Sequence, residues 1–264
     1  MELNTEKMIG EKEGGIGWMT FNNPARRNAM SLDMWEGVET ILDEFESDDD
    51  IKVIVMRGAG DKAFVSGADI SEFKERRNNA EAAAEYARIS EGARARLMGV
   101  KKPLIAMIQG YCLGGGMAVA MAADMRFATE DSQFGIPAAR LSIAYGYDGL
   151  HKLVHLVGPA MASEIMFTAR RVQPDEAQRI GLINRAVPVD ELEAAVREVA
   201  DAICRNAPLS IAASKHTIGQ ILTDKEDRDY DEIKRMSQMC FDSNDYKEGR
   251  EAFMEKRSPV FTGT

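Results

Sequence analysis

Three consecutive glycines, Gly114, Gly115 and Gly116, follow an apolar segment that predicts a buried strand from Leu104 to Ile108. Glycine lets a backbone approach a ligand closely, and the first amides of a helix have no partner inside that helix. Amides of this kind can hold a negatively charged oxygen. The spacing therefore indicates an oxyanion site where a strand turns into a helix. The alternative is a tight turn that binds no ligand.

Strands and helices alternate in the first part of the chain. A strand is predicted from Gly15 to Phe21, Ser31 is a predicted N-cap for an amphipathic helix that runs to about Ser47, and Ile51 to Met56 predicts a buried strand. This order is typical of βαβ units, whose parallel sheet binds ligands at the carboxyl ends of its strands. The fold class expected is therefore α/β.

Beyond Asp148 the sequence pattern is almost wholly helical. Helices are predicted near residues 149–157, 160–168, 174–180, 189–206, 211–222 and 229–240. Helices appended to an α/β core often pack against neighbouring subunits. We expect a core that carries the site over residues 1–200 and a helical oligomerisation region over residues 201–264.

Composition excludes several classes of protein. The 264 residues are 45% hydrophobic, enough for one large core, and the net charge of -10 disfavours nucleic acid or an anionic membrane as a partner. No signal peptide or apolar run long enough to cross a bilayer is apparent, so we expect a soluble protein. Three widely spaced cysteines, Cys112, Cys204 and Cys240, indicate a reducing compartment, which predicts a cytoplasmic location.

Several further motifs occur in a characteristic order. They are Asn23-Pro24 with Asn28-Ala29, the segment from Ala63 to Ile70, Lys102-Pro103 through to Gly116, Asp124, Phe134-Gly135, Phe167-Thr168-Ala169, Ala177, Gly181-Leu182 and Glu251-Ala252-Phe253. In order and spacing they resemble the crotonase superfamily of enoyl-CoA hydratases and isomerases, and the resemblance covers nearly the whole chain. It implies a spiral of βαβ turns, a homotrimer or dimer of trimers, and acyl-CoA substrates in which coenzyme A is part of the substrate, with no separate cofactor.

The resemblance also assigns site residues. It places the oxyanion hole on the backbone N–H groups of Ala68 and Gly115, which would hold the thioester oxygen as it becomes an enolate. It implies that coenzyme A is bound by two N-terminal segments and, across a subunit contact, by residues near the C-terminus. The residues so implied are Ala25, Arg26, Ala63, Ser66, Ala68, Asp69, Ile70, Phe253 and Lys256. Arg26 and Lys256 are equally compatible with ordinary surface charges.

Two positions depart from the family pattern. Hydratases of this family use one glutamate to orient and deprotonate water and another to protonate the α-carbon, a division typical of general acid and base catalysis. The matching positions here are Ala118 and Ala138. The resemblance therefore implies enolate chemistry that differs from standard two-glutamate hydration.

The loop after Ala138 offers other groups for proton transfer. Asp148 is a candidate base, because burial beside an acyl chain would raise the pKa of its carboxyl, and an N-cap explains it equally well. Isomerases of the family carry a carboxylate in this loop at the position of Gly146. An enoyl-CoA isomerase or hydratase that uses Asp148 is therefore one alternative.

A second branch of the family lacks both glutamates. Decarboxylases that act on methylmalonyl-CoA resemble this chain at Tyr145 and at Gly149-Leu150-His151, although they place a histidine where this chain has Ala68. Loss of carbon dioxide from a malonyl-type thioester needs chiefly an enolate-stabilising hole. Tyr145 is thus a candidate catalytic residue or a packed aromatic side chain. A coenzyme A-binding protein without chemistry is a third alternative.

Two other constellations carry little chemistry. His151 and His155 would share a helical face, but no third ligand is indicated, so no metal site is predicted. Ser66 and Ser142 have no convincing histidine partner in the sequence, which disfavours a serine-hydrolase triad.

Overall fold

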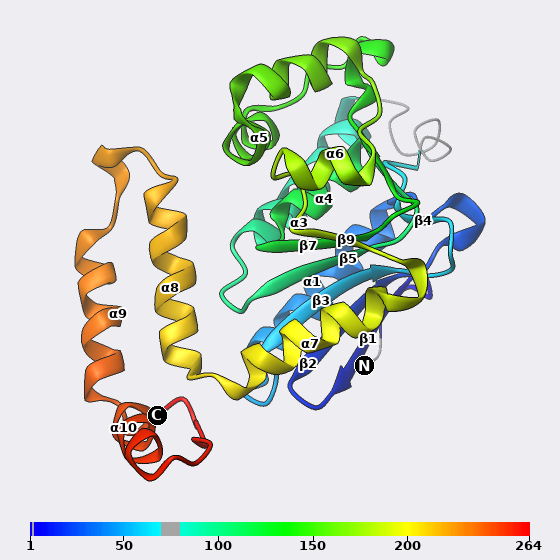
Figure 1. Cartoon of the computed structure of the whole chain (residues 1–264). Coiled ribbons are helices and arrows are strands. Elements are labelled where there is room, and N and C mark those ends of the chain that lie inside the picture. Colours follow the sequence, from blue (N-terminus) through cyan, green and yellow to red (C-terminus); the bar gives the residue numbers. More distant parts are fainter. Residues whose placement is uncertain (2, 70–79) are drawn as a thin grey trace.

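A six-stranded sheet lies at the centre of the computed structural model, which describes residues 1, 3–69 and 80–264 (Figure 1). Its strand order is β1-β2-β3-β5-β7-β9, and all neighbours are parallel except β1 and β2. The strands are β1 (Met8–Glu13), β2 (Ile16–Phe21), β3 (Val53–Gly58), β5 (Leu104–Ile108), β7 (Met125–Thr129) and β9 (Arg185–Val187).

A second, three-stranded parallel sheet has the order β4-β6-β8. Its strands are β4 (Ala63–Val65), β6 (Tyr111–Leu113) and β8 (Gln133–Gly135). Along the chain, β3, β5 and β7 of the large sheet are each followed by one strand of the small sheet. Each turn of the chain therefore adds one strand to each sheet, which confirms the predicted α/β spiral.

Helices cover the sheets and form the end of the chain. The α-helices are α1 (Leu32–Ser47), α3 (Ala80–Met98), α4 (Gly115–Ala122), α5 (Tyr147–Thr168), α6 (Pro174–Arg179), α7 (Leu192–Arg205), α8 (Pro208–Ile221), α9 (Tyr230–Asp242) and α10 (Asn244–Glu255). Four 3-10 helices are also described: η1 (Pro24–Arg26), η3 (Pro137–Leu141), η4 (Val189–Glu191) and η5 (Lys225–Asp227).

Both faces of the large sheet are buried, which explains the continuous apolar run of β3. Val53 and Val55 face α7, where they pack with Val196. Ile54 and Met56 belong to the larger cluster on the opposite face, together with residues of α1 and α3. Alternate residues thus enter two different cores, as expected for a parallel strand covered on both sides.

The predicted elements agree with the structure, but β1, α3, β7 and the three strands of the small sheet were not predicted. The helices expected at 149–157 and 160–168 form α5, which is interrupted at Gly158, where φ is 77° and Pro159 follows. The strand β9 lies inside the region predicted as almost wholly helical, and α10 was not predicted. Three residues are too few to show a periodic pattern, so β9 left no signal in the sequence.

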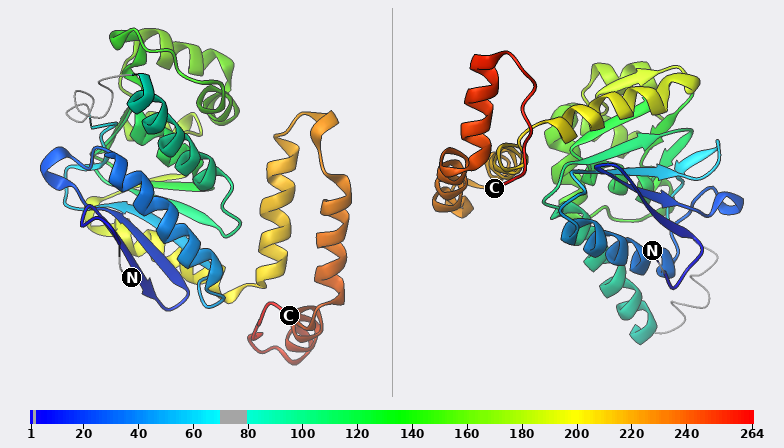
Figure 2. Two further views of the ribbon diagram at one scale, coloured as in Figure 1. Left: turned by 180° about the vertical axis from the view of Figure 1, so that it is seen from behind. Right: turned by 90° about the horizontal axis from the view of Figure 1, so that it is seen from below.

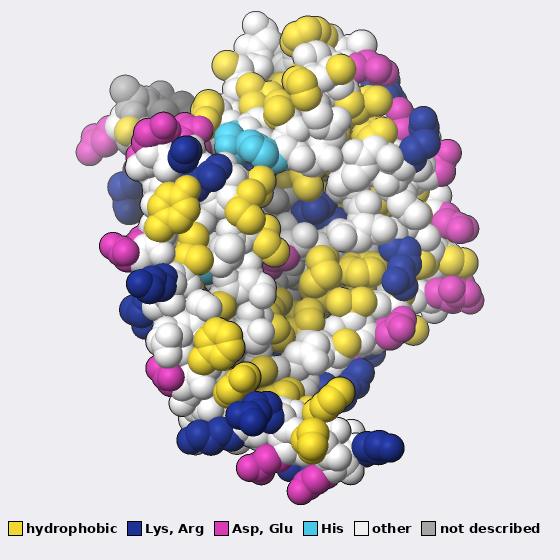
Figure 3. All heavy atoms as spheres, turned by 60° about the vertical axis from the view of Figure 1, so that its left-hand side comes forward, with side chains coloured by type: hydrophobic (Ala, Val, Ile, Leu, Met, Phe, Trp, Pro, Cys, Tyr) yellow, Lys and Arg dark blue, Asp and Glu magenta, His cyan; other side chains and the backbone are white. Residues whose placement is uncertain are grey.

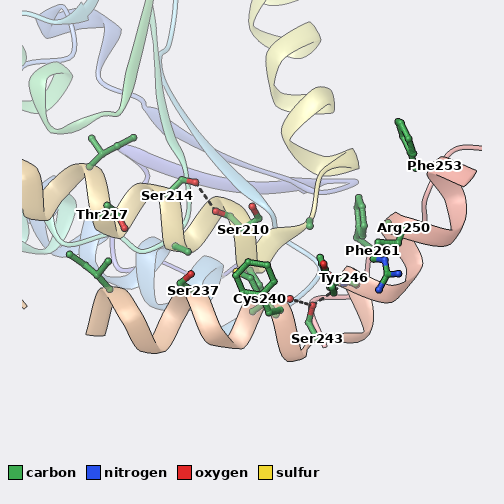
Figure 4. A pocket seen from close by; sticks show the side chains of 18 of the residues that line it. Ser210, Ser214, Thr217, Ser237, Cys240, Ser243, Tyr246, Arg250, Phe253 and Phe261 are labelled. Atoms are coloured by element: carbon green, nitrogen blue, oxygen red, sulfur yellow. Dashed lines mark hydrogen bonds between the residues drawn. The ribbon is translucent and has the colours of Figure 1, made fainter. Parts of the chain in front are cut away.

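The helices α8, α9 and α10 stand apart from the layered core (Figures 1 and 2). They surround an apolar groove, into which Figure 4 shows several of their side chains pointing. Helix α7 passes through residue 200 and packs on the sheet through Ala200. The division of the chain at residue 200 stays a prediction. Among the described helices, none combines the length and apolarity that a membrane span requires.

Candidate functional site

The three glycines at the start of α4 meet three different structural demands. Gly114 has a φ of 53°, in the region that favours glycine, and its N–H donates to the Gly135 carbonyl at 2.8 Å. A Cβ on Gly116 would overlap the carbonyl oxygen of Val65 and lie 2.7 Å from its carbonyl carbon. Gly115 lies between them as the first residue of α4. The run therefore brings the helix start against the chain that leaves β4.

Two backbone amides face the same small space at this contact. A Cβ on Gly115 would lie 3.6 Å from the Ala68 nitrogen, which is ordinary van der Waals contact. The neighbours of Ala68 are hydrogen-bonded to the backbone of Met30. The Gly67 carbonyl accepts from the Met30 amide at 2.8 Å, and the Asp69 amide donates to the Met30 carbonyl at 2.9 Å. Within the described residues, neither the Ala68 amide nor the Gly115 amide donates a hydrogen bond. Both donors are therefore available to a ligand.

Asn28 fixes the loop that precedes this site. Its side chain is fully buried, and its Nδ2 donates to the carbonyls of Ala59 at 3.0 Å and Ala63 at 2.7 Å. Its Oδ1 accepts from the Asn23 amide at 2.9 Å. The backbone of Asn28 has a φ of 55°, a conformation that asparagine adopts more readily than most residues. In the sequence, Asn28 stands out only as part of a motif, and no pattern there predicts this positioning role.

The two segments implied to bind coenzyme A lie side by side. Ala25 and Arg26 form an exposed turn in η1, while Ala63 is buried at the start of β4. The Ser66 amide donates to the Arg27 carbonyl at 3.2 Å, which joins the segments. Asp69 follows Ala68 and is buried, whereas Ile70 lies outside the described residues.

The two C-terminal residues implied to bind coenzyme A lie on a different part of the chain. Phe253 on α10 is 83% exposed, and Lys256 follows the end of this helix with a φ of 56°. Figure 1 shows α10 well away from β4 and α4. A single chain therefore does not bring these residues to the glycine site, and their contact with coenzyme A across a subunit interface stays a prediction.

The two positions that the resemblance matches to the family glutamates lie close to the glycine run. Ala118 is half-buried on α4, and Ala138 is buried in η3. Pro137, which precedes Ala138, lies against the glycine run, because a Cβ on Gly114 would lie 3.9 Å from its Cδ. Neither alanine can transfer a proton. The nearby Cys112 thiol is buried, and burial raises its pKa, so it is not an ionised nucleophile.

Tyr145 is held in one orientation by close packing on Gly149. A Cβ on Gly149 would overlap Cε1 of its ring and lie 3.1 Å from Cδ1, so only glycine leaves room there. Its hydroxyl is buried and has no hydrogen-bond partner within the described part of the chain. Burial raises the pKa of Tyr145 to about 12, and the positive charge of Arg94 opposes this shift only in part. Tyr145 is therefore a neutral hydrogen-bond donor at neutral pH.

The structure places Asp148 neither as a buried base nor as an N-cap, the two roles that the sequence suggested. The N-cap of α5 is Gly146, so Asp148 is the second residue of the helix and not its cap. Its side chain is exposed, so the burial that would favour a catalytic base does not occur within one chain. Helix α5 begins two residues earlier than the cap interpretation requires, which moves Asp148 past the capping position.

The rings of His151 and His155 contact each other with their planes tilted by 51°. Their ring centroids are 4.1 Å apart, and His155 Nδ1 lies 2.8 Å from the His151 carbonyl oxygen. In the part of the chain that the structure describes, no group of three potential ligands converges on a point where a metal ion could bind.

Comparison with known proteins gives matches along the whole chain. Residues 11–264 match the family model described as Enoyl-CoA hydratase/isomerase. The chain is 37% identical to short-chain-enoyl-CoA hydratase of Clostridium acetobutylicum, with 97% of each chain covered, and 33% identical to crotonyl-CoA hydratase of Syntrophomonas wolfei, with 97% of this chain and 98% of the relative covered. A crystal structure of an enoyl-CoA hydratase/carnithine racemase from Magnetospirillum magneticum matches with a TM-score of 0.92 at 35% identity, covering 99% of this chain and 97% of that chain.

Proposed function

The chain belongs to the enoyl-CoA hydratase/isomerase family, and from this premise we propose that it binds an acyl-CoA thioester and stabilises its enolate with the amides of Ala68 and Gly115. The observation that carries this proposal is the pair of unpaired amides that share one space. Donors that are fixed before the reaction stabilise developing negative charge without reorganisation. Coenzyme A would be held by the loop of Ala25 and Arg26 and by the segment from Ala63 to Asp69.

The reaction proposed differs from two-glutamate hydration. Ala118 and Ala138 leave no carboxylate at the positions that transfer protons in hydratases of this family. Proton transfer then falls to bound water, Tyr145 or Asp148. Because Asp148 is exposed in one chain, an isomerase or hydratase mechanism that uses Asp148 requires a neighbouring subunit to cover it. Tyr145 is buried and neutral, so it can donate a hydrogen bond but is a poor base.

Decarboxylation of a malonyl-type acyl-CoA is the second candidate. It is favoured by a specific combination, a buried neutral hydroxyl at Tyr145 and alanine in place of both carboxylates. In such a reaction the bond between the α-carbon and the carboxylate breaks, carbon dioxide leaves, and the electron pair forms the enolate that the two amides hold. A carboxylate at position 118 or 138 would repel the charge of this substrate.

We also propose that the active form is a homotrimer or a dimer of trimers in the cytoplasm. Large apolar side chains are exposed on the C-terminal helices, including Ile218, Ile221, Phe241 and Phe253. Figure 3 shows hydrophobic side chains gathered around the hollow between these helices and the core. Large exposed apolar patches mark interaction surfaces. The three cysteines form no disulfide, which fits a reducing compartment.

The test of enolate stabilisation is exchange of the α-hydrogens. Butyryl-CoA is incubated with the protein in deuterium oxide, and deuterium at the α-carbon is measured by mass spectrometry. We expect protein-dependent exchange, together with slow or absent hydration of crotonyl-CoA. Release of carbon dioxide from methylmalonyl-CoA would identify the second candidate. Binding of all these thioesters without exchange or conversion would overturn the proposal in favour of a non-catalytic coenzyme A-binding protein.

A further inference from the structure

The helices α8, α9 and α10, which together form the C-terminal unit, are attached to the core by little apolar packing. No residue of α8 or α9 is buried, and within the described residues neither apolar core includes a residue beyond Cys204. A hollow with apolar side chains on both sides lies between α8 and the core, among them Met121 on the core and Ile218 on α8 (Figure 3). Apolar packing therefore does not fix the unit on the core.

The covalent link to this unit is short and extended. Helix α7 ends at Arg205 and α8 begins at Pro208, so only Asn206 and Ala207 lie between them. The ψ angles of these two residues are 159° and 114°, which belong to extended backbone. Rotation about these bonds would turn the whole unit relative to the core.

Lys215 on α8 reaches the core with its ammonium group. Its Nζ lies 2.7 Å from Asp124 Oδ2 and donates to the Lys102 carbonyl at 2.8 Å. Within the described residues, these are the only hydrogen bonds between residues 208–264 and residues 1–205. The Lys215 side chain is 19% exposed, which limits the screening of this ion pair by salt.

Both partners of Lys215 are fixed in the core. Asp124 Oδ2 also accepts from the Leu104 amide at 2.7 Å, and the Asp124 amide donates to the Leu104 carbonyl at 2.8 Å. Leu104 is the first residue of β5, and Asp124 directly precedes β7. Lys102 is held by its own Nζ, which donates to the carbonyl of Phe45 in α1 at 2.6 Å. A single side chain thus anchors the C-terminal unit at the edge of the large sheet.

We propose that Lys215 is a positioning residue for the binding of coenzyme A. Its two bonds to the core set the place of the C-terminal unit, which carries Phe253 and Lys256, the two residues expected to contact coenzyme A on a neighbouring subunit. This inference rests on the proposed function. Because α8, α9 and α10 line a common groove, a turn of the unit would move both residues together.

The first test is limited digestion with trypsin, which reports how freely the link opens. Arg205 is exposed, and Asn206 lies outside both helices, so a cut between them gives the fragments 1–205 and 206–264. Lys215→Met keeps an unbranched side chain but loses the charge and the donors. This cut should be severalfold faster in Lys215→Met than in the wild-type protein, because cleavage follows the population of the open form. Cuts at other sites should keep their rates.

The second test separates binding from catalysis. The concentration of butyryl-CoA that half-saturates α-hydrogen exchange should rise severalfold in Lys215→Met. The rate at saturation should stay at the wild-type value, because the amides of Ala68 and Gly115 are untouched. The dissociation constant for free coenzyme A, measured by displacement of a fluorescent derivative, should rise by the same factor. A residue that only stabilised the fold would not raise the half-saturating concentration alone.

Three further variants assign the effect to the ion pair. Lys215→Arg should restore the wild-type values in both tests, since it keeps the charge and the donors. Asp124→Asn keeps an oxygen for the Leu104 amide and removes the charge, so it should act in the same direction as Lys215→Met and add little to it. Lys234→Met is the matched control and should behave as wild type, because it alters an exposed lysine of α9.

Wild-type digestion or wild-type affinity for coenzyme A in both Lys215→Met and Asp124→Asn would overturn the inference. Failure of the enolate proposal would look different, since the wild-type protein would then bind butyryl-CoA without exchange. In that case the digestion and the dissociation constants for free coenzyme A would still decide the role of Lys215.

Discussion

Substitution of Gly115 by alanine tests the proposed oxyanion hole without disturbing the fold. The added methyl group would lie 3.6 Å from the Ala68 nitrogen, with no closer neighbour, and the backbone of Gly115 is outside the left-handed region. The fold should accept it, since alanine in place of glycine changes helix stability by only about 1 kcal/mol, in the favourable direction. The same methyl group would occupy the space in which an oxygen must lie to accept from the Ala68 amide.

Loss of one such donor reduces the rate by about 10²- to 10³-fold, which corresponds to roughly 2.7–4 kcal/mol. We therefore expect Gly115→Ala to unfold at the same urea concentration as the wild-type protein or slightly above it. Its rate of α-deuterium exchange into butyryl-CoA should fall by the factor given. The affinity for free coenzyme A should stay the same, because coenzyme A has no thioester oxygen to bind there.

Gly116→Ala is the matched control for the fold. Its methyl group would overlap the Val65 carbonyl oxygen, so the backbone of α4 or β4 must move. Overpacking of this kind costs about 1–3 kcal/mol, and the variant should unfold at a lower urea concentration. A fully folded Gly115→Ala protein with wild-type exchange would refute the assignment of the hole to these two amides. Equal loss of stability in both variants would refute the geometry on which the contrast depends.

Three further predictions concern Asn28, Tyr145 and the C-terminal helices. Asn28→Ala removes three hydrogen bonds and leaves a non-glycine residue at a φ of 55°. The free energy of unfolding, measured by urea titration, should therefore fall by about 2–4 kcal/mol. An unchanged urea midpoint would contradict the positioning role of Asn28. Burial raises the pKa of Tyr145 from 10.0 to about 12, so the neutral Tyr145 keeps its full contribution to the free energy of unfolding below pH 10, and this contribution is lost as the pH rises to about 12. The absorbance at 295 nm should show one tyrosine that titrates late. This late phase should be missing in Tyr145→Phe. Sedimentation of the wild-type protein should give a mass equal to three or six chains. Phe241→Asp, which alters a side chain exposed on α9, should give a smaller mass. A monomeric wild-type protein would refute the oligomer proposal.

Three strands of the large sheet, β2, β3 and β5, were predictable because each carries its own apolar pattern. Strand β5 was predicted from Leu104 to Ile108, which are its bounds in the structure, since parallel strands read as short apolar runs. The strands of the small sheet have three residues each, and such short segments carry no periodicity. Their positions are fixed by pairing with strands distant in the sequence, so only the three-dimensional structure reveals them.

The glycine run was predictable because backbone geometry restricts its residue types. Only glycine fits at Gly114, where φ is positive, and at Gly116, where the Val65 carbonyl touches the helix. The role of Asn28 left no comparable local signal, since its partners Ala59 and Ala63 are 31 and 35 residues away in the sequence. The exposure of Asp148 could not be predicted either, because it depends on where α5 begins.

The register of the small sheet explains why two distant segments form one site. Strands β4 and β6 are parallel neighbours, and Val65 is paired with Cys112. Ala68 is three residues beyond Val65, and Gly115 is three residues beyond Cys112, so the two donors follow the ends of adjacent strands. The register of this strand pair shifts between Ala63 and Val65. A shift of one residue in this register would displace them by about 3.3 Å, more than a hydrogen bond to one shared oxygen tolerates. The proposed hole consists of main-chain atoms held by strand pairing, so alanine at positions 118 and 138 would leave it intact. On this proposal, the reaction would differ from hydration while the means of holding the enolate stays the same.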